Sequence, residues 1–262
     1  MTTSGVTRAS SSVWRSCCRL FRGVGRGVAG VAALLYPPIC VRCGGPTVWG
    51  AVVCPVCSGH LPLSLGPACA VCGQSLGGQL LRGRLLEGDE LDLCLRCGTR
   101  IRSFDRALAL GPYDEGWREL LLAFKFRGEK AVGRWLAGEL AKRAREADAS
   151  FDWVTHVPMT RSEERERGFN PSRYLARLTA RRLGLRDRRL LVKVRPTPPQ
   201  RTLGARERET NLSEAFRAVR SGTGAVLLVD DLLTTGATAD ECARTLKGAG
   251  FDSVTVLTVA RA

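Results

Sequence analysis

Residues 225–241 constrain the fold more than any other part of the chain. An apolar run, 225–229, leads directly into two adjacent acids, Asp230 and Asp231. An uninterrupted run of this kind is typical of a strand that is buried on both faces of a parallel sheet. In open α/β sheets, ligands bind beyond the carboxyl ends of such strands. We therefore predict an α/β fold in which the two acids lie at the ligand site.

The loop after the acids has the composition of an anion site. Its three threonine hydroxyls can donate to phosphate oxygens, and Gly236 permits a positive φ, so that successive N–H groups converge on one point. Thr238 and Glu241 match a capping box, which predicts a helix N-terminus directly after the loop. The loop lacks the lysine of a Walker A motif. The predicted phosphate-binding residues are Thr234, Thr235, Gly236, Ala237 and Thr238.

The acid pair calls for a different ligand group, because carboxylates repel a neighbouring phosphate. Asp230 and Asp231 suit ribose hydroxyls, or a Mg²⁺ ion held through water. A phosphate site beside a diol or metal site suggests a ribose 5-phosphate group. The alternative is an ordinary strand–turn–helix, in which the acids and the threonines would have no packing role.

Residues 226–238, VLLVDDLLTTGAT, resemble the thirteen-residue phosphoribosyl pyrophosphate (PRPP) motif of type I phosphoribosyltransferases over its whole length. The resemblance implies an open, mainly parallel sheet of the type I phosphoribosyltransferase kind. It also implies that PRPP binds with Mg²⁺. Asp230 and Asp231 would be the catalytic acids that hold the ribose hydroxyls or Mg²⁺, and residues 234–238 would hold the 5-phosphate.

Eight of the eleven cysteines form four CxxC pairs. A CxxC turn places two sulfurs on one metal ion, and two turns complete a tetrahedral Cys₄ zinc site. One or two structural Zn²⁺ ions are expected, with sequential pairing of the turns as the simplest arrangement and interleaved pairing as the alternative. The lack of a secretory signal disfavours disulfides, and four repeats are too many for a redox dithiol. The sequential sites are Cys40, Cys43, Cys54 and Cys57, and Cys69, Cys72, Cys94 and Cys97.

Other features of the cysteine-rich part give smaller expectations. The glycine-rich gap 73–93 is predicted to be a flexible insertion, and His60 to face solvent rather than bind metal. A glycine follows three of the second cysteines and should ease the turn there. The remaining cysteine near the C-terminus, Cys242, is predicted to be a small core residue.

The middle of the chain alternates strand and helix patterns. Asn170 is a good N-cap, Pro171 fits the first helical position, and Gly184 fits the end of that helix. Strands are predicted at 105–113 and 153–159, and helices at 116–129 and 130–147.

Two segments are candidates for binding the pyrophosphate group. Residues 161–169 are predicted to be a charged loop whose arginines can bind pyrophosphate, the alternative being a solvated, salt-bridged loop, since three glutamates interleave them. Residues 195–216 contain three prolines and are predicted to be a mobile lid that enters a helix near 206. The proposed pyrophosphate ligands are Arg161, Arg165 and Arg167, and the lid residues are Arg195, Gln200, Arg201 and Arg208.

The net charge of +15 favours polyanionic partners. A GC-rich coding bias is the alternative source of so much arginine, but residues 161–208 alone hold 15 basic against five acidic residues. No apolar run reaches the length that spans a bilayer, so we expect a cytoplasmic protein without stable membrane insertion. The basic leader, 1–34, is expected to be flexible.

An ordered set of motifs extends the resemblance to the ComF family from residue 35 to residue 262. The departure from the family pattern is Pro171, where the family usually has glutamine. The resemblance implies a double zinc ribbon at 35–103 and a phosphoribosyltransferase-like domain at 104–262. The motifs are YPPICVRCG, CPVC, CAVCG, LAFKFRG, VPMTRSEERERGFN, RPTPPQRTLGARERETNLSEAF and VLLVDDLLTTGAT.

The ComF resemblance implies a PRPP-binding protein that assists DNA uptake during natural transformation. Its partners would be single-stranded DNA or another nucleic acid, and competence or helicase proteins. Two alternatives stay open. One is an active phosphoribosyltransferase that acts on an unidentified base or small nucleophile. The other is a PRPP-sensing regulator without turnover, which the lack of a preceding helix-turn-helix disfavours.

Overall fold

The computed structural model describes residues 38–48, 51–62, 67–76, 81–84, 90–195 and 215–262. The predicted leader, with Cys17 and Cys18, lies outside these residues, as does the helix expected near residue 206. None of the helices in the described ranges is both long and apolar enough to cross a membrane.

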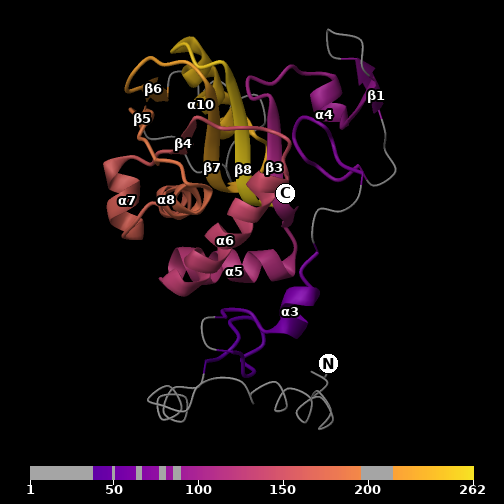
Figure 1. Ribbon diagram of the computed structural model, residues 1–262, viewed down its shortest axis with the longest axis vertical. Helices are drawn as coiled ribbons and strands as arrows, with labels where there is room; N and C mark the ends of the chain where they lie inside the picture. The colour runs from indigo at the N-terminus through magenta and orange to yellow at the C-terminus, as the bar shows by residue number, and fades with distance from the viewer. Residues whose placement is uncertain (1–37, 49–50, 63–66, 77–80, 85–89, 196–214) are drawn as a thin grey trace, which may run out of the picture.

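The described residues contain an open sheet of four parallel strands in the order β3, β8, β7, β4 (Figure 1). The sheet confirms the predicted α/β class. The apolar run at 225–229 does form a central strand, but the strand continues through both acids to Leu233 because its partner β8 keeps pairing with it to Arg261. The bounds are Arg106–Pro112 for β3, Trp153–His156 for β4, Ala225–Leu233 for β7 and Ser253–Arg261 for β8.

Alternate residues of β7 pack into two separate cores, as expected for a strand buried on both faces. Leu227 and Val229 belong to the core under α5, α6 and α8, whereas Val226 and Leu228 belong to the core under α10. Cys242 of α10 is fully buried in this second core, which confirms the prediction for that cysteine. The bounds are Glu115–Phe126 for α5, Lys130–Glu146 for α6, Pro171–Leu183 for α8 and Ala237–Gly248 for α10.

Helix α8 begins and ends as its sequence predicts. The Asn170 side chain accepts a hydrogen bond from the Arg173 N–H at 3.0 Å, Pro171 opens the helix, and Gly184 closes it with a φ of 74°. These signals place the start of α8 beside the end of β4.

The cysteine-rich part forms two ribbons that pack on different parts of the α/β core (Figure 1). The first ribbon contains α3, Pro55–Gly59, and the Trp117 indole N–H of α5 donates to the carbonyl of Pro62 at 2.9 Å. The second contains α4, Leu95–Gly98, and extends to β3, where the Ala107 N–H donates to the Val71 carbonyl at 2.7 Å.

The gap 73–93, predicted to be a flexible insertion, contains regular structure that the prediction did not include. Strands β1, Leu81–Arg84, and β2, Glu90–Leu93, pair antiparallel there. Backbone pairing between the two arms of the gap supplies order that the glycine content did not suggest. A second antiparallel pair joins β5, Leu191–Lys193, to β6, Phe216–Ala218.

Candidate functional site

A cavity of about 580 Å³ lies beside the acid pair of β7. Residues from α5, α7 (Arg161–Arg167), α8, β5, β6 and α10 also line it, so it lies where the sheet and the covering helices meet. The volume suits a ligand of nucleotide size. The lining residues on which the site depends are Lys125, Arg167, Ser172, Asp230, Asp231 and Thr238.

The two acids occupy different environments within this cavity. Asp231 forms an ion pair with Lys125, with 2.8 Å between Oδ1 and Nζ, and both side chains are less than 15% exposed. Asp230 accepts hydrogen bonds from the Ser172 hydroxyl at 2.8 Å and from the Asp231 N–H at 2.9 Å. Burial, and then the charge of Asp231, raise the pKa of Asp230 to about 7 against these two bonds and Lys125. The pair therefore joins a charge-balanced carboxylate to one that gains and loses a proton near neutral pH.

The loop after β7 has the backbone of an anion site. Gly236 takes a φ of 80°, and helix α10 begins at the next residue. The predicted capping box of Thr238 and Glu241 is wrong, because Gly236 is the N-cap and Thr238 lies two residues further along the chain. Thr235 instead accepts the Ala237 N–H at 3.3 Å with its hydroxyl.

The predicted charged loop at 161–169 is in large part a helix. Helix α7 spans Arg161–Arg167, and Thr160 caps it in a reciprocal capping box with Glu163, with hydrogen bonds of 2.7 and 3.2 Å. Arg161 and Arg165 are exposed on this helix. Arg167 alone of the three proposed pyrophosphate ligands is among the residues lining the described cavity, where its guanidinium lies 5.5 Å from the Phe126 ring centroid.

Glu163 pairs across the cavity with Lys193, with 2.6 Å between the two charged groups. Burial alone would raise the pKa of Glu163, but the hydrogen bond and charge of Lys193, with the bonds from Thr160, lower it. This pair fixes α7 to β5.

The proposed lid is described only at its edges. Arg195 is exposed just after β5, whereas Gln200, Arg201 and Arg208 lie outside the described residues. Lys193 and Phe216 stand opposite each other in the β5–β6 pair and both line the cavity. The segment between them therefore starts and ends at the site.

The cysteines form two compact clusters with the sequential pairing, which excludes the interleaved one. Within each cluster the four sulfurs lie within 4.8 Å of one another. Tetrahedral zinc with Zn–S bonds of 2.3 Å requires sulfur separations of about 3.8 Å. The Sγ atoms of Cys43 and Cys54 are 3.9 Å apart, and those of Cys72 and Cys94 are 3.6 Å apart. Both clusters therefore fit zinc.

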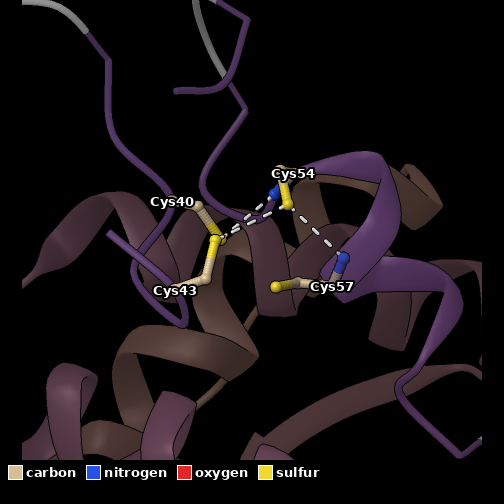
Figure 2. Close-up of side chains that lie close together, drawn as sticks. All are labelled: Cys40, Cys43, Cys54 and Cys57. Carbon is tan, nitrogen blue, oxygen red and sulfur yellow. Dashed lines mark hydrogen bonds between the residues drawn. The ribbon is translucent and has the colours of Figure 1, made fainter. Parts of the chain in front are cut away.

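Figure 2 shows the first cluster, in which the Cys40 and Cys43 side chains face those of Cys54 and Cys57. The Cys54 N–H donates to the Cys40 sulfur at 3.3 Å, and the Cys57 N–H donates to the Cys54 sulfur at 3.4 Å. Such bonds stabilise thiolates. His60 is exposed and lies outside both clusters, as expected.

The second cluster is the more deeply buried, since all four of its cysteines are buried and Cys43 of the first is exposed. Hydrogen bonds from Cys69 and Cys97 hold the pKa of Cys72 well below its usual range against burial, and the Arg261 guanidinium adds to this effect. Each of the nine described cysteines is a free thiol. Three glycines follow the second cysteine of a CxxC pair. Gly44 and Gly73 have a φ of 66°, whereas Gly98 lies within α4 and has no positive φ.

Three further site residues did not emerge from the sequence. Lys125 was visible only as a basic helix end, Ser172 as an ordinary helical residue, and Lys193 as part of a basic stretch. Each acts on an acid far away in the chain, so local patterns carry no signal for it. Pro171 also lines the cavity, so this chain offers a ring at the place where the ComF pattern has glutamine.

Comparison with known proteins agrees with this architecture. Residues 31–98 match the double zinc ribbon domain family. Over 223 residues the chain is 29% identical to competence protein F of Haemophilus influenzae, covering 80% of this chain and 96% of that protein. The chain is thus similar to competence protein F over most of both sequences. The recognition of the ComF family from its motifs is thereby confirmed.

The chain has two further similarities. It is 29% identical to the DNA utilization protein YhgH of Salmonella typhi over 238 residues, which is 87% of this chain and 99% of that protein. Among solved structures, the glutamine PRPP amidotransferase from B. subtilis is similar at 21% identity and a TM-score of 0.35. That alignment covers 52% of this chain and only 30% of the enzyme chain.

Proposed function

We propose that this chain is a PRPP-binding protein of the ComF type that acts in DNA handling. The observation that carries the proposal is that one cavity gathers Asp230 and Asp231, Thr238 at the start of α10, and the basic side chains of Lys125 and Arg167. Acids for a diol, helical N–H groups for a phosphate and cations for a pyrophosphate are the groups that PRPP requires.

The assignment of ligand parts follows from these positions. Asp230 and Asp231 would hold the ribose hydroxyls, and residues 234–238 would hold the 5-phosphate around the positive-φ Gly236. Arg167 would bind the pyrophosphate, while Arg161 and Arg165 raise the positive potential along α7.

Magnesium fits the same acids, since carboxylate oxygens are the ligands that Mg²⁺ prefers. Asp230 and Asp231 would hold the ion through water, and the ion would neutralise charge on the pyrophosphate. The chain itself supplies Lys125, which balances Asp231, and Ser172, which orients Asp230.

Titration calorimetry with PRPP and Mg²⁺ tests the binding proposal. Asp231→Asn and Thr235→Ala should each weaken PRPP binding at least tenfold, because each removes a group from the assigned site. Asp148→Asn is a matched control, since Asp148 is an exposed acid after α6. Equal PRPP affinity in all four proteins would sink the assignment.

An active phosphoribosyltransferase is the second candidate, favoured by the complete acid pair at the cavity. Positioned charges of this kind supply most of the catalysis that phosphoryl and glycosyl transfers need. Pyrophosphate release from PRPP, measured across a panel of bases, distinguishes turnover from binding. Release above the PRPP-only background with any base would establish an enzyme.

The DNA-handling part of the proposal draws on the relatives named competence protein F and DNA utilization protein. It also draws on an exposed row of arginines along α8 at Arg173, Arg177 and Arg181. Spacing of four residues places them on one helical face. Single-stranded DNA affinity should therefore fall steeply with salt, and charge reversal of this row should reduce the slope. Weak binding that does not depend on salt would exclude this role.

We place the module boundaries at 1–34, 35–103 and 104–262. We also propose a cytoplasmic location, since the two four-cysteine clusters need reduced thiolates to hold zinc. Protein partners would then be competence or helicase proteins of the same compartment.

A further inference from the structure

Arg261, at the end of β8, is a buried cation between the second cysteine cluster and residues 234–238, the proposed phosphate loop. Its side chain belongs to a residue that is 6% exposed. The guanidinium donates to the Cys72 carbonyl and to the Gln74 amide oxygen, each at 3.2 Å, and lies 3.7 Å from the Cys72 sulfur. On its other side it donates to the Leu233 carbonyl at 3.2 Å and to the Thr234 carbonyl. One side chain therefore touches both sites.

Zinc binding would add negative charge beside this cation. The guanidinium meets the Cys72 sulfur, the Gln74 amide oxygen and the oxygen of Ala262. Four thiolates around one Zn²⁺ carry a net charge of about −2. A zinc-loaded second cluster would therefore strengthen the attraction that holds Arg261 in place.

Two more arginines of the second ribbon hold the next carbonyl of the loop. Arg96, which lies between two of the zinc ligands, donates to the Thr235 carbonyl at 3.4 Å, and Arg102 donates to it at 3.1 Å. Asp240, in the first turn of α10, accepts the Ser103 N–H at 2.6 Å. Hydrogen bonds from the second ribbon therefore hold the chain at several points between residues 233 and 240.

Holding these carbonyls fixes the opposite edge of the loop. A trans peptide is planar, so its N–H points away from its C=O. The described peptides are all trans. With the Thr234 and Thr235 carbonyls turned toward the ribbon, the Thr235 and Gly236 N–H groups must point to the other side. Those N–H groups are the donors that an anion at this loop requires.

The first cluster provides an internal comparison, because its contacts run to α5 instead. Arg42 of that ribbon pairs with Glu119 at 3.5 Å and donates to the Cys57 carbonyl at 3.2 Å. In the described part of the chain, its contacts do not reach residues 233–240.

We propose that Arg261 positions the phosphate loop against the second cysteine cluster, so that zinc at that cluster and a phosphate ligand at the loop strengthen each other's binding. The ligand part of this inference rests on the proposed PRPP site. Coupling of two ligands through a shared element is reciprocal, so each ligand must raise the affinity of the other by the same factor.

The test uses the full zinc-loaded chain and follows zinc release to a coloured chelator, with PRPP affinity measured separately. In Arg261→Met, one of the two zinc ions should leave about tenfold faster, as for other residues that support metal ligands. PRPP affinity should fall by a similar factor. Arg261→Lys should partly restore both the slow zinc release and the PRPP affinity. If Arg261→Met does not fold, the comparison of Arg261→Lys with the wild type carries the test.

Cluster-specific variants separate this coupling from general damage. Cys97→Ser should weaken PRPP binding, whereas Cys57→Ser should leave it within twofold. PRPP should slow zinc release from the second cluster but not from the first. Zinc release unchanged by PRPP and by Arg261→Met would overturn the inference while leaving PRPP binding in place. If the wild type binds no PRPP, the proposed function fails, and faster zinc loss in Arg261→Met would still support the positioning role of Arg261.

Discussion

Lys125 of α5 and Asp231 of β7 form an ion pair at the candidate site, with 2.8 Å between Nζ and Oδ1. Both side chains are largely buried, so the loss of one partner leaves a charge with little solvent around it. Lys125→Met should lower the free energy of unfolding by about 2 kcal/mol. Urea unfolding measures this change.

A double-mutant cycle provides the control for this pair. Asp231→Asn combined with Lys125→Met should cost less than the two single changes together, with a coupling of at least about 1 kcal/mol. Strict additivity would show that the two groups do not depend on each other.

The positive φ of Gly236 provides a second prediction. Gly236→Ala should lower stability by about 1–2 kcal/mol, because alanine at a φ of 80° is strained even though a Cβ would meet only ordinary contacts. The change should also weaken binding of PRPP, since it alters the loop that presents the N–H groups.

Gly168→Ala is the matched control for that change. Gly168 has a φ of 84° at the end of α7, with open space around a Cβ. The Gly168→Ala variant should lose about as much stability as Gly236→Ala in unfolding experiments, but its PRPP affinity should stay within about twofold of the wild type. Equal loss of affinity in both variants would point to strain alone.

The Glu163–Lys193 pair predicts a pH dependence of stability. The pKa of Glu163 is lowered in the folded chain, so the pair contributes stability above the ordinary glutamate pKa. That contribution is lost as the pH falls through the lowered pKa. Lys193→Met should therefore be less stable than the wild type at pH 7, and the difference should shrink toward pH 3. A difference that stays constant between these pH values would contradict the assignment.

The two zinc clusters should differ in how fast they lose metal. Cys43 of the first cluster is exposed, whereas all four cysteines of the second are buried. A chelator should therefore remove zinc in two phases, and Cys57→Ser should abolish the fast one. A single phase, or loss of the slow phase in Cys57→Ser, would contradict this order.

Local signals predicted much of this structure, and one repeated pattern shows their limit. The apolar run before Asp230 predicted a central strand, and the CxxC spacing predicted both clusters. A threonine followed three residues later by glutamate occurs at Thr160 and at Thr238. At Thr160 it caps α7, although the density of charge suggested a loop. At Thr238 it does not mark the start of α10, because the N-cap of that helix is Gly236.

Contacts between distant residues could not be predicted in the same way. Lys125 meets Asp231, and Arg261 meets Cys72, only because the sheet brings α5, β7, β8 and the second ribbon together. No periodicity or spacing in the chain records these pairs. The acids were therefore identified from the sequence, whereas the cations that balance and position them required the fold.

The most direct test of the account is a calorimetric comparison of PRPP, ribose 5-phosphate and pyrophosphate, each titrated with Mg²⁺ into the zinc-loaded chain. The account assigns separate groups to the two halves of PRPP within one cavity. It therefore predicts one PRPP per chain, bound at least tenfold more tightly than either fragment. PRPP binding no tighter than pyrophosphate alone would show a general polyanion surface and contradict the PRPP site.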